Sequence, residues 1–491
     1  MNKFVFLIAF SMLGTVSYGQ ARCTVELTLQ KAVELAYDSS IEAFRSQNIY
    51  LSKYWGYRNY KARRLPSITL KTTPIQYNRD IVQRYISYAD RIEYRTQRSL
   101  YSYGNLSVMQ NLDWTGGTFY LDSELGFFRN FGQSVTNQFT TVPIRVGYSQ
   151  SLVGYNPFKW ERLIEPIKYG QAKKELAYNL GATSVTVVDY FFSIALAECN
   201  CKLAVKNMES CQRLYNEGIE RHKNNKLSST ELLSIELALI DARNARISCE
   251  NIRQKTLTAL SSFLNIPEED SLSIVIPNQL PVDFIDRTQA LEYTRMNHPT
   301  YDEQKRNVSE AQQEVEKSRK ERFLEANVNL SVGFNQVANE LGMAYRRPLQ
   351  QNVISVGVTI PLVDWGIRRG NYRMAQNNLK VTEGAARQEI QAVEEEILSV
   401  VNDFNTQVQI LHASQRAVEL AEQVYCESIE RFRIGRDDIN SLLDNMLKVQ
   451  EAQIKLVQSQ YVCWKSYYRI QQMTCFDFQR RCKVEVYISN E

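Results

Sequence analysis

After its first twenty positions the sequence contains no run of 18 or more apolar residues. A membrane-spanning helix needs about 20 such residues, so the mature chain is predicted to have none. Histidine is scarce, and the nine cysteines are odd in number and lack the spacing of a disulfide scaffold. Cys199 and Cys201 would point about 200° apart on a helix, so they cannot hold one metal ion together. We therefore predict ordinary packing for these residues and no bound metal.

Signatures of catalysis and of nucleotide binding are missing as well. The sequence has no phosphate-binding glycine loop, no nucleophile elbow and no HExxH metal helix. The net charge is only +4, and charges of both signs mix along the chain, which does not favour nucleic-acid binding. The sequence predicts no enzyme, no cofactor and no nucleic-acid partner.

The N-terminus has the composition of a secretory signal peptide. An apolar run from Phe4 to Val16 follows Met-Asn-Lys, and small or polar residues continue to Gln20. We assign residues 1–20 to the signal peptide, since the run is too short for a membrane anchor. Cys23 is an alternative lipid-attachment site, but an arginine precedes it where a small residue is expected. An exported chain of this kind is secreted, periplasmic or a β-barrel.

The chain repeats itself. A shift of 210 residues superposes a helical segment of the first half on one of the second half without a gap, and a weaker match near the start of each half has a shift of 258. The first half therefore holds about 50 extra residues. The predicted organisation is a first repeat at 21–266 with an insertion at 76–141, a connector at 267–286, a second repeat at 287–475, and a peripheral C-terminal segment at 476–491.

Four segments have the alternating pattern of strands, two in each half. Apolar residues alternate with small polar ones from Asn327 to Asn335, from Ile354 to Ile360, from Val142 to Ser149 and, more weakly, from Ile68 to Lys71. A membrane barrel has this pattern, with a polar face toward a wet lumen, and so has a soluble sheet with one buried face. The export signal favours the barrel. The residues predicted to face the lumen are Arg145, Ser149, Asn327, Asn329 and Ser331.

Within the insertion, Trp114-Thr115-Gly116-Gly117 stands between two alternating stretches and predicts a β-hairpin. We place this hairpin on the outer loop side of the barrel.

Each second strand is followed by a break and then by a very long helical pattern. In the second half, apolar residues recur at intervals of three and four from Ile390 to Leu411, within a pattern that runs from about 367 to 433. At 1.5 Å per residue such a helix extends about 100 Å. The first half has a counterpart from about Phe158 to His222. Short polar turns then reverse the chain, so two antiparallel helical hairpins with matched tips are predicted.

At this point the sequence resembles the TolC family of outer-membrane efflux proteins. The resemblance rests on four stretches in the family's order, which are residues 62–66 (ARRLP), 356–366 (VGVTIPLVDWG), 431–435 (RFRIG) and 441–444 (SLLD). It implies a mainly α-helical homotrimer with a transmembrane β-barrel, in which four strands per chain make twelve and a helical tunnel crosses the periplasm. The implied partners are outer-membrane lipid, a periplasmic adaptor protein and an inner-membrane pump of a Gram-negative bacterium.

The resemblance also implies a constriction at the hairpin tips. Asp444 matches one acidic residue of the family's periplasmic entrance, whereas Ser441 stands where a second is expected. Glu231 matches the acidic residue of the first hairpin, and Phe432 stands where the family has a tyrosine. The family's basic latch residue falls on Asp437. The predicted gate residues are Glu231, Arg436, Asp437, Asp438 and Asp444, with Glu231 and Arg436 as a latch.

The leading function is therefore a passive exit duct of a tripartite efflux system. The same duct would serve type I protein secretion, and these residues do not separate the two cargoes. A structural periplasmic coiled-coil protein is a further alternative, which the helical part alone would allow.

Overall fold

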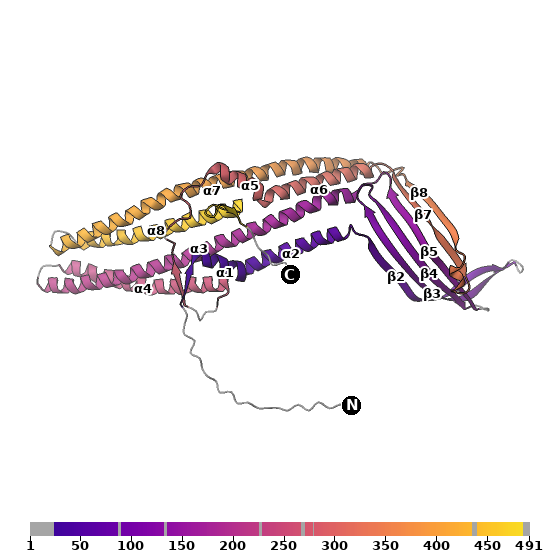
Figure 1. Ribbon diagram of the computed structural model, residues 1–491. Coiled ribbons are helices and arrows are strands. Elements are labelled where there is room, and N and C mark those ends of the chain that lie inside the picture. The colour runs from indigo at the N-terminus through magenta and orange to yellow at the C-terminus, as the bar shows by residue number, and fades with distance from the viewer. Residues whose placement is uncertain are drawn as a thin grey trace, which may run out of the picture.

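The computed structural model describes residues 24–86, 90–131, 135–224, 228–266, 271–277, 279–434 and 439–484. The predicted signal peptide lies outside these residues. A long bundle of helices joins a twisted sheet at one end (Figure 1). The helices are α1 (Leu29–Ser39), α2 (Ile41–Ala62), α3 (Pro157–Lys223), α4 (Ser229–Leu264), α5 (Arg287–Asn297), α6 (Pro299–Glu321), η1 (Met343–Tyr345), α7 (Ile367–Arg433) and α8 (Ile439–Thr474).

The strands fall into one large sheet and two small ones. The large sheet has the order β2 (Ser67–Ile86), β3 (Arg91–Leu112), β4 (Gly117–Phe131), β5 (Val135–Ser151), β7 (Glu325–Ala338) and β8 (Leu349–Thr359), with every neighbouring pair antiparallel. The small sheets pair β1 (Thr24–Thr28) with β6 (Ser271–Val275), and β9 (Phe476–Asp477) with β10 (Cys482–Lys483).

Local sequence signals set the ends of the long helices. Asn156 caps α3 by accepting a hydrogen bond from the Lys159 backbone N–H at 3.2 Å, and Pro157 follows at the first helical position, where its missing N–H costs nothing. Ser228 and Glu231 form a reciprocal capping box at the start of α4. The two predicted helical hairpins begin within one residue of their predicted starts at Phe158 and 367, and α3 and α7 each contain 67 residues.

The element bounds repeat with the two shifts found in the sequence. Both bounds of α7 follow those of α3 by the shift of the helical segments, and α8 follows α4 in the same way. Both bounds of α5 follow those of α1 by the second, larger shift, as does the start of β7 relative to the start of β2. Strands β3 and β4 have no counterpart among the described residues of the second half, so the extra residues of the first half are this pair of strands.

The expectation of four strands per chain is wrong. The insertion does not form an outer loop, because β3 and β4 pair along their lengths with β2 and β5 and extend the sheet to six strands. The hairpin at Trp114 exists, but its turn lies at the helical end of the sheet, where β2 begins and β5 ends. The alternation of residues identifies a strand, but it carries no information about which end of the sheet the following turn occupies. The sequence therefore could not place this hairpin.

Contacts on both sides fix this turn between two helices. Arg64, just after α2, forms an ion pair with Asp113. The Asn156 side chain, at the start of α3, donates to the Asp113 carbonyl at 2.9 Å. Gly116 has φ of +76°, a left-handed conformation that glycine adopts without strain. The hairpin is thus built into the junction between sheet and helices.

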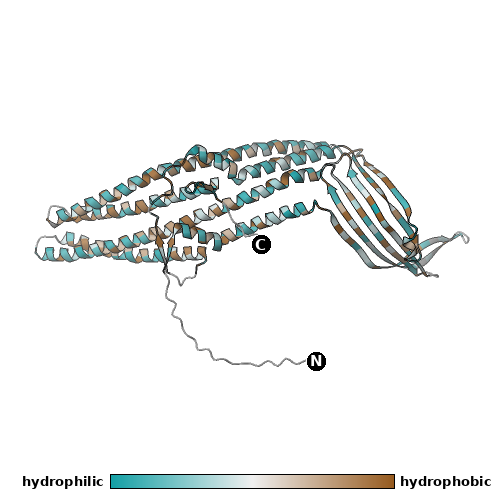
Figure 2. Cartoon of the chain, in the orientation of Figure 1, coloured by the Kyte–Doolittle hydropathy of each residue, from teal (hydrophilic) through white to brown (hydrophobic). Residues whose placement is uncertain are grey.

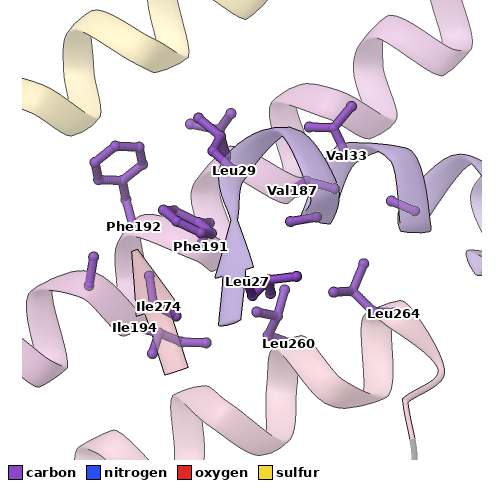
Figure 3. Packing of buried hydrophobic residues seen from close by; sticks show 14 of the residues in the cluster. Leu27, Leu29, Val33, Val187, Phe191, Phe192, Ile194, Leu260, Leu264 and Ile274 are labelled. Carbon is purple, nitrogen blue, oxygen red and sulfur yellow. The ribbon is translucent and has the colours of Figure 1, made fainter. Parts of the chain in front are cut away.

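The largest apolar cluster lies midway along the helices, where β1 and β6 pair. Leu27 of β1 and Phe191 and Phe192 of α3 are fully buried there, together with Leu260 of α4 (Figure 3). Strand β6 lies within the predicted connector at 267–286, and its partner β1 was not predicted. A second cluster joins α5, α7 and α8 around Phe404. Close approach of α3 and α8 needs Gly181, since a Cβ there would lie 2.9 Å from the Cα of Gln472.

Among the described residues, one helix is long and apolar enough to cross a membrane. An 18-residue window in α3 is long and apolar enough, but 56% of it is buried inside the protein. Phe191 and Phe192 supply apolar side chains of this helix to the central cluster. This length of apolar helix, which the sequence analysis did not single out, is therefore used for packing between helices.

Candidate functional site

The large sheet has its polar and apolar faces reversed relative to a soluble protein. Polar residues on one face are nearly covered, as in Asn105 and Asp122, which are 9% and 8% exposed. The opposite face is apolar and open to the surroundings, and Figure 2 shows the alternation along each strand. Its exposed residues include Ile68, Leu70, Leu106, Phe119, Val146, Leu330, Val332, Ile354, Val356 and Val358. An apolar face of this size fits contact with lipid rather than water.

All five residues predicted to face a lumen lie on the polar face. In the register of β5 with β7, Arg145 is opposite Gly333, Ser149 is opposite Asn329, and Gly147 between them is opposite Ser331. Asn327 lies opposite Ser151 on the same face. The structure therefore brings the five together. That this face borders a lumen stays a prediction, because the single chain forms an open sheet.

A charged cluster occupies the middle of the polar face. The Arg145 guanidinium donates to Asp122 through Nη2 at 2.5 Å and through Nε at 3.0 Å, and its Nη2 lies 3.7 Å from Glu124. Both acidic residues come from β4, within the insertion, so the sequence analysis missed them. Their signal was the two-residue spacing of Asp122 and Glu124 between Leu121 and Leu125. A bidentate pair of this kind suits a wet wall and would be costly on the lipid side.

At the far end of the helices, Asp444 is exposed and belongs to an ion pair within its own helix. Its Oδ2 lies 2.6 Å from the Nζ of Lys448, one turn further along α8. Pairs of this kind at the surface contribute about 0 to 1 kcal/mol. Lys448 was not predicted to take part. Each Asp444 therefore carries a positive charge beside it, which weakens the field that it creates.

Glu231 has a structural task at the tip of the first hairpin. Ser228 donates to its carboxylate from the hydroxyl at 2.7 Å and from the backbone N–H at 2.8 Å, which holds the pKa of Glu231 below its ordinary value. The other predicted gate residues, Arg436, Asp437 and Asp438, lie outside the residues that the structure describes. A latch between Glu231 and Arg436 stays a prediction.

An apolar cluster links the two hairpins just behind their tips. Ile235 of the first hairpin packs with Phe432, Ile439 and Leu442 of the second, and all four are buried. Arg221 of α3 places its guanidinium 4.7 Å from the centre of the Phe432 ring, a cation–π contact between the hairpins. The residue that stands in place of the family's tyrosine thus still joins the two hairpins, and Arg221 is a contact that the sequence analysis missed.

Metal-binding groups and disulfide bonds are both absent from the described residues. Within them, no group of three or more histidine, cysteine, aspartate or glutamate residues could hold a metal ion. The eight cysteines that the structure describes are free thiols.

A sheet with one exposed apolar face and one nearly covered polar face, joined to helices about 100 Å long, has the architecture of an outer-membrane channel. A family model described as outer membrane efflux protein matches residues 290–474. The fold is that of solved channels over nearly the whole chain. None of the curated protein sequences compared with the chain matches it significantly.

Three solved structures illustrate the likeness. The Campylobacter jejuni CmeC outer membrane channel is 13% identical over 91% of this chain and 85% of its own, with a TM-score of 0.64. CusC is 12% identical over 94% and 95%, with a TM-score of 0.63. VceC of Vibrio cholerae is 13% identical over 93% and 97%, with a TM-score of 0.60. The predicted resemblance to the TolC family of outer-membrane efflux proteins is confirmed. The predicted location, in the outer membrane of a Gram-negative bacterium with an extension into the periplasm, is confirmed with it.

Proposed function

We propose that the protein is a passive exit duct of a tripartite efflux system, which receives substrates from an inner-membrane pump and a periplasmic adaptor protein. The observation that supports this most strongly is the reversed sheet, whose apolar face is exposed, continued by the helices of α3 and α7. A wall of this kind fits a water-filled passage that crosses lipid and continues into the periplasm. In this proposal the chain performs no chemistry and needs no cofactor, and energy comes from the pump.

The duct requires several copies of the chain. The sheet ends in two unpaired edge strands, β2 and β8, and unpaired backbone groups are costly in a membrane. β2 runs away from the helices and β8 runs toward them, so β2 of one copy can pair antiparallel with β8 of the next. We propose a homotrimer, as the family resemblance implies. Three six-stranded sheets then give a barrel of eighteen strands instead of the twelve first expected.

Exposed stripes on the helices support the same assembly. Leu233, Leu237, Ile240 and Ile247 of α4 are all exposed, with the four-three-seven spacing of a coiled-coil seam. Ile410, Leu420 and Val424 form a similar stripe on α7. We propose that α4 of one copy packs against α7 of the next, so that the helices of three copies enclose a tunnel.

In the assembled duct, the polar face with Arg145, Ser149, Asn327, Asn329 and Ser331 would line the barrel. The tips with Glu231, Arg436, Asp437, Asp438 and Asp444 would form the periplasmic entrance. We propose that three copies of Asp444 set the charge of this entrance.

Replacing Asp444 with asparagine is expected to lower the preference of the pore for potassium over chloride by about twofold or more, because three negative charges leave the narrowest region. Lys448→Gln is the matched control, since it removes the neighbouring positive charge and should raise the cation preference. Reversal potentials in planar bilayers under a salt gradient measure both. If Asp444→Asn leaves the selectivity unchanged, Asp444 does not line the entrance.

Planar bilayers also test the duct itself. Purified protein should produce discrete conductance steps. The proposal would be contradicted if neither the wild type nor Asp444→Ala, which lacks the charge proposed for the entrance, conducted any current. Type I protein secretion is the second candidate, because nothing in the wall selects small cargo. A strain from which the gene has been deleted, with and without the gene restored, separates the two functions. Lower intracellular accumulation of a fluorescent dye after restoration supports efflux, whereas restored release of a protein without a change in dye accumulation supports secretion.

A further inference from the structure

Three arginines lie side by side at the outer end of the sheet. In the register of β2 with β3, Arg79 is directly opposite Arg98. In the register of β3 with β4, Arg129 is opposite Leu100, the next residue after Arg98 on the same face of the strand. We call Arg79, Arg98 and Arg129 the outer arginine row. It contains one residue from each of three neighbouring strands.

The outer arginine row belongs to the lipid-facing side of the sheet. Arg98 and Leu100 lie on the same face of β3 as Leu106 and Val108, because these residues are separated by even numbers of positions. Tyr77 lies opposite Leu100 and is 55% exposed. Going outward along β3 on this face, Leu100 is followed by the charged Arg98 and the polar Thr96, and exposed Tyr94 and Ile92 lie farther out. Charged residues in such a position are expected where lipid tails give way to headgroups.

The distance from the helical end of β3 to Arg98 also places the row at the level of the lipid headgroups. At about 3.3 Å per residue and a tilt of about 40°, β3 rises about 35 Å along the membrane normal between its end at Leu112 and Arg98. An apolar band of about 25 Å that begins a few residues above the helical end therefore stops just below the row. The row lies at the outer leaflet, since the helices occupy the periplasmic side.

The positive charge of the row is not balanced within the described chain. Like charges directly opposite one another destabilise a strand pair. No described carboxylate pairs with Arg79, Arg98 or Arg129. Asp80 pairs with Gln97 on the other face of the same hairpin. The Nε of Arg129 is buried without a hydrogen-bond partner, and its guanidinium lies 5.2 Å from the Phe131 ring. An anion between these guanidinium groups would offset their mutual repulsion.

We propose that the outer arginine row binds the phosphate group of a phosphorylated lipid in the outer leaflet. Arginine offers several donors in a planar fork that fits phosphate oxygens, and two opposite guanidinium groups can share one phosphate. Exposed Tyr77, which lies opposite Leu100 on the side of the row nearer the helices, supplies an apolar surface for the acyl chains. That surface favours a lipid over free phosphate. The proposal depends on the outer-membrane location and is independent of what passes through the duct.

The test measures lipid binding by full-length, delipidated protein in detergent, with native mass spectrometry as readout. The probes are dipalmitoyl phosphatidic acid, dipalmitoylglycerol without the phosphate, and inorganic phosphate. Phosphatidic acid should bind and the phosphate-free lipid should not. Arg79→Ala/Arg98→Ala should weaken phosphatidic acid binding by about tenfold or more, because charge-assisted hydrogen bonds are lost.

The matched control is Arg346→Ala/Arg347→Ala, which removes two exposed charges from the loop between η1 and β8 at the same end of the sheet. It should change binding by less than about twofold, because these residues are outside the row. Arg79→Lys/Arg98→Lys keeps the charge and should show an intermediate loss, which tests the site even if the alanine variant misfolds. Equal weakening by the control, unchanged binding in both row variants, or inorganic phosphate binding as tightly as the lipid would overturn the proposal.

Discussion

Replacing Phe191 with alanine is expected to lower the free energy of unfolding of the helical part by about 3 to 5 kcal/mol. The side chain is fully buried where β1, β6, α1, α3 and α4 meet, so its removal leaves a cavity that several elements would have to close together. The effect should appear as a lower midpoint in guanidinium unfolding followed by circular dichroism at 222 nm.

A matched control is Ile41→Ala at the start of α2, whose side chain is 84% exposed. Surface substitutions of this kind change stability by about 0.5 kcal/mol. Equal midpoints for the Phe191→Ala protein and the wild type would show that the central cluster does not hold the helices together.

The second large effect concerns the two faces of the sheet. Leu330→Arg is expected to destabilise the folded barrel by about 2 to 4 kcal/mol, because it places a charge on the lipid-facing side near the middle of β7. Ser331→Arg, at the next position, is expected to cost less than about 1 kcal/mol, because its side chain lies on the polar face. Leu330 is opposite Ile354 and Ser331 is opposite Val353, so the two sites have comparable positions along the sheet.

Reversible unfolding in urea from lipid vesicles measures both variants. The comparison is internal, since the added side chain is the same and the strand is the same. Equal losses would mean that both faces meet the same surroundings, and a greater loss for Ser331→Arg would mean that the polar face is the one in contact with lipid.

The long helices could be predicted because local signals agree with the period of the pattern. Pro157 and the pair Ser228 and Glu231 mark starts, and the seam around Phe404 recurs at intervals of three and four. The duplication provides a check, because a helix predicted in one half has to have a counterpart at the same shift in the other half. This is why the bounds of α3 and α7 lay within one or two residues of the prediction.

The same reliance on duplication explains the wrong strand count. β3 and β4 have no counterpart in the part of the second half that the structure describes, so a search for matched strands assigned them to a loop. Tertiary contacts hold these two strands in the sheet. Arg145 forms an ion pair with Asp122 on the neighbouring strand, and Arg64 forms one with Asp113 at the turn. Partners this far apart in sequence have no local signature. The outer arginine row was missed for the same reason, because the register alone brings Arg79 and Arg98 together.

Two extra strands per chain change the dimensions of the proposed duct. With strands about 4.8 Å apart and tilted by about 40°, twelve strands close at a diameter of roughly 24 Å and eighteen at roughly 36 Å. The number of helix-to-strand connections per chain stays at four, at α2, α3, α6 and α7. The barrel would therefore be wider relative to its helical tunnel than in a twelve-stranded duct, and the helical entrance rather than the barrel would limit conductance.

The mass of the detergent-extracted protein, measured by light scattering with the detergent contribution subtracted, tests the shared barrel most directly. We expect three times the mass of the mature chain, which gives eighteen strands. Two copies would also close a barrel, with twelve strands, and that mass would contradict the proposed trimer. A single chain mass would contradict the shared barrel itself, since one six-stranded sheet leaves both β2 and β8 unpaired.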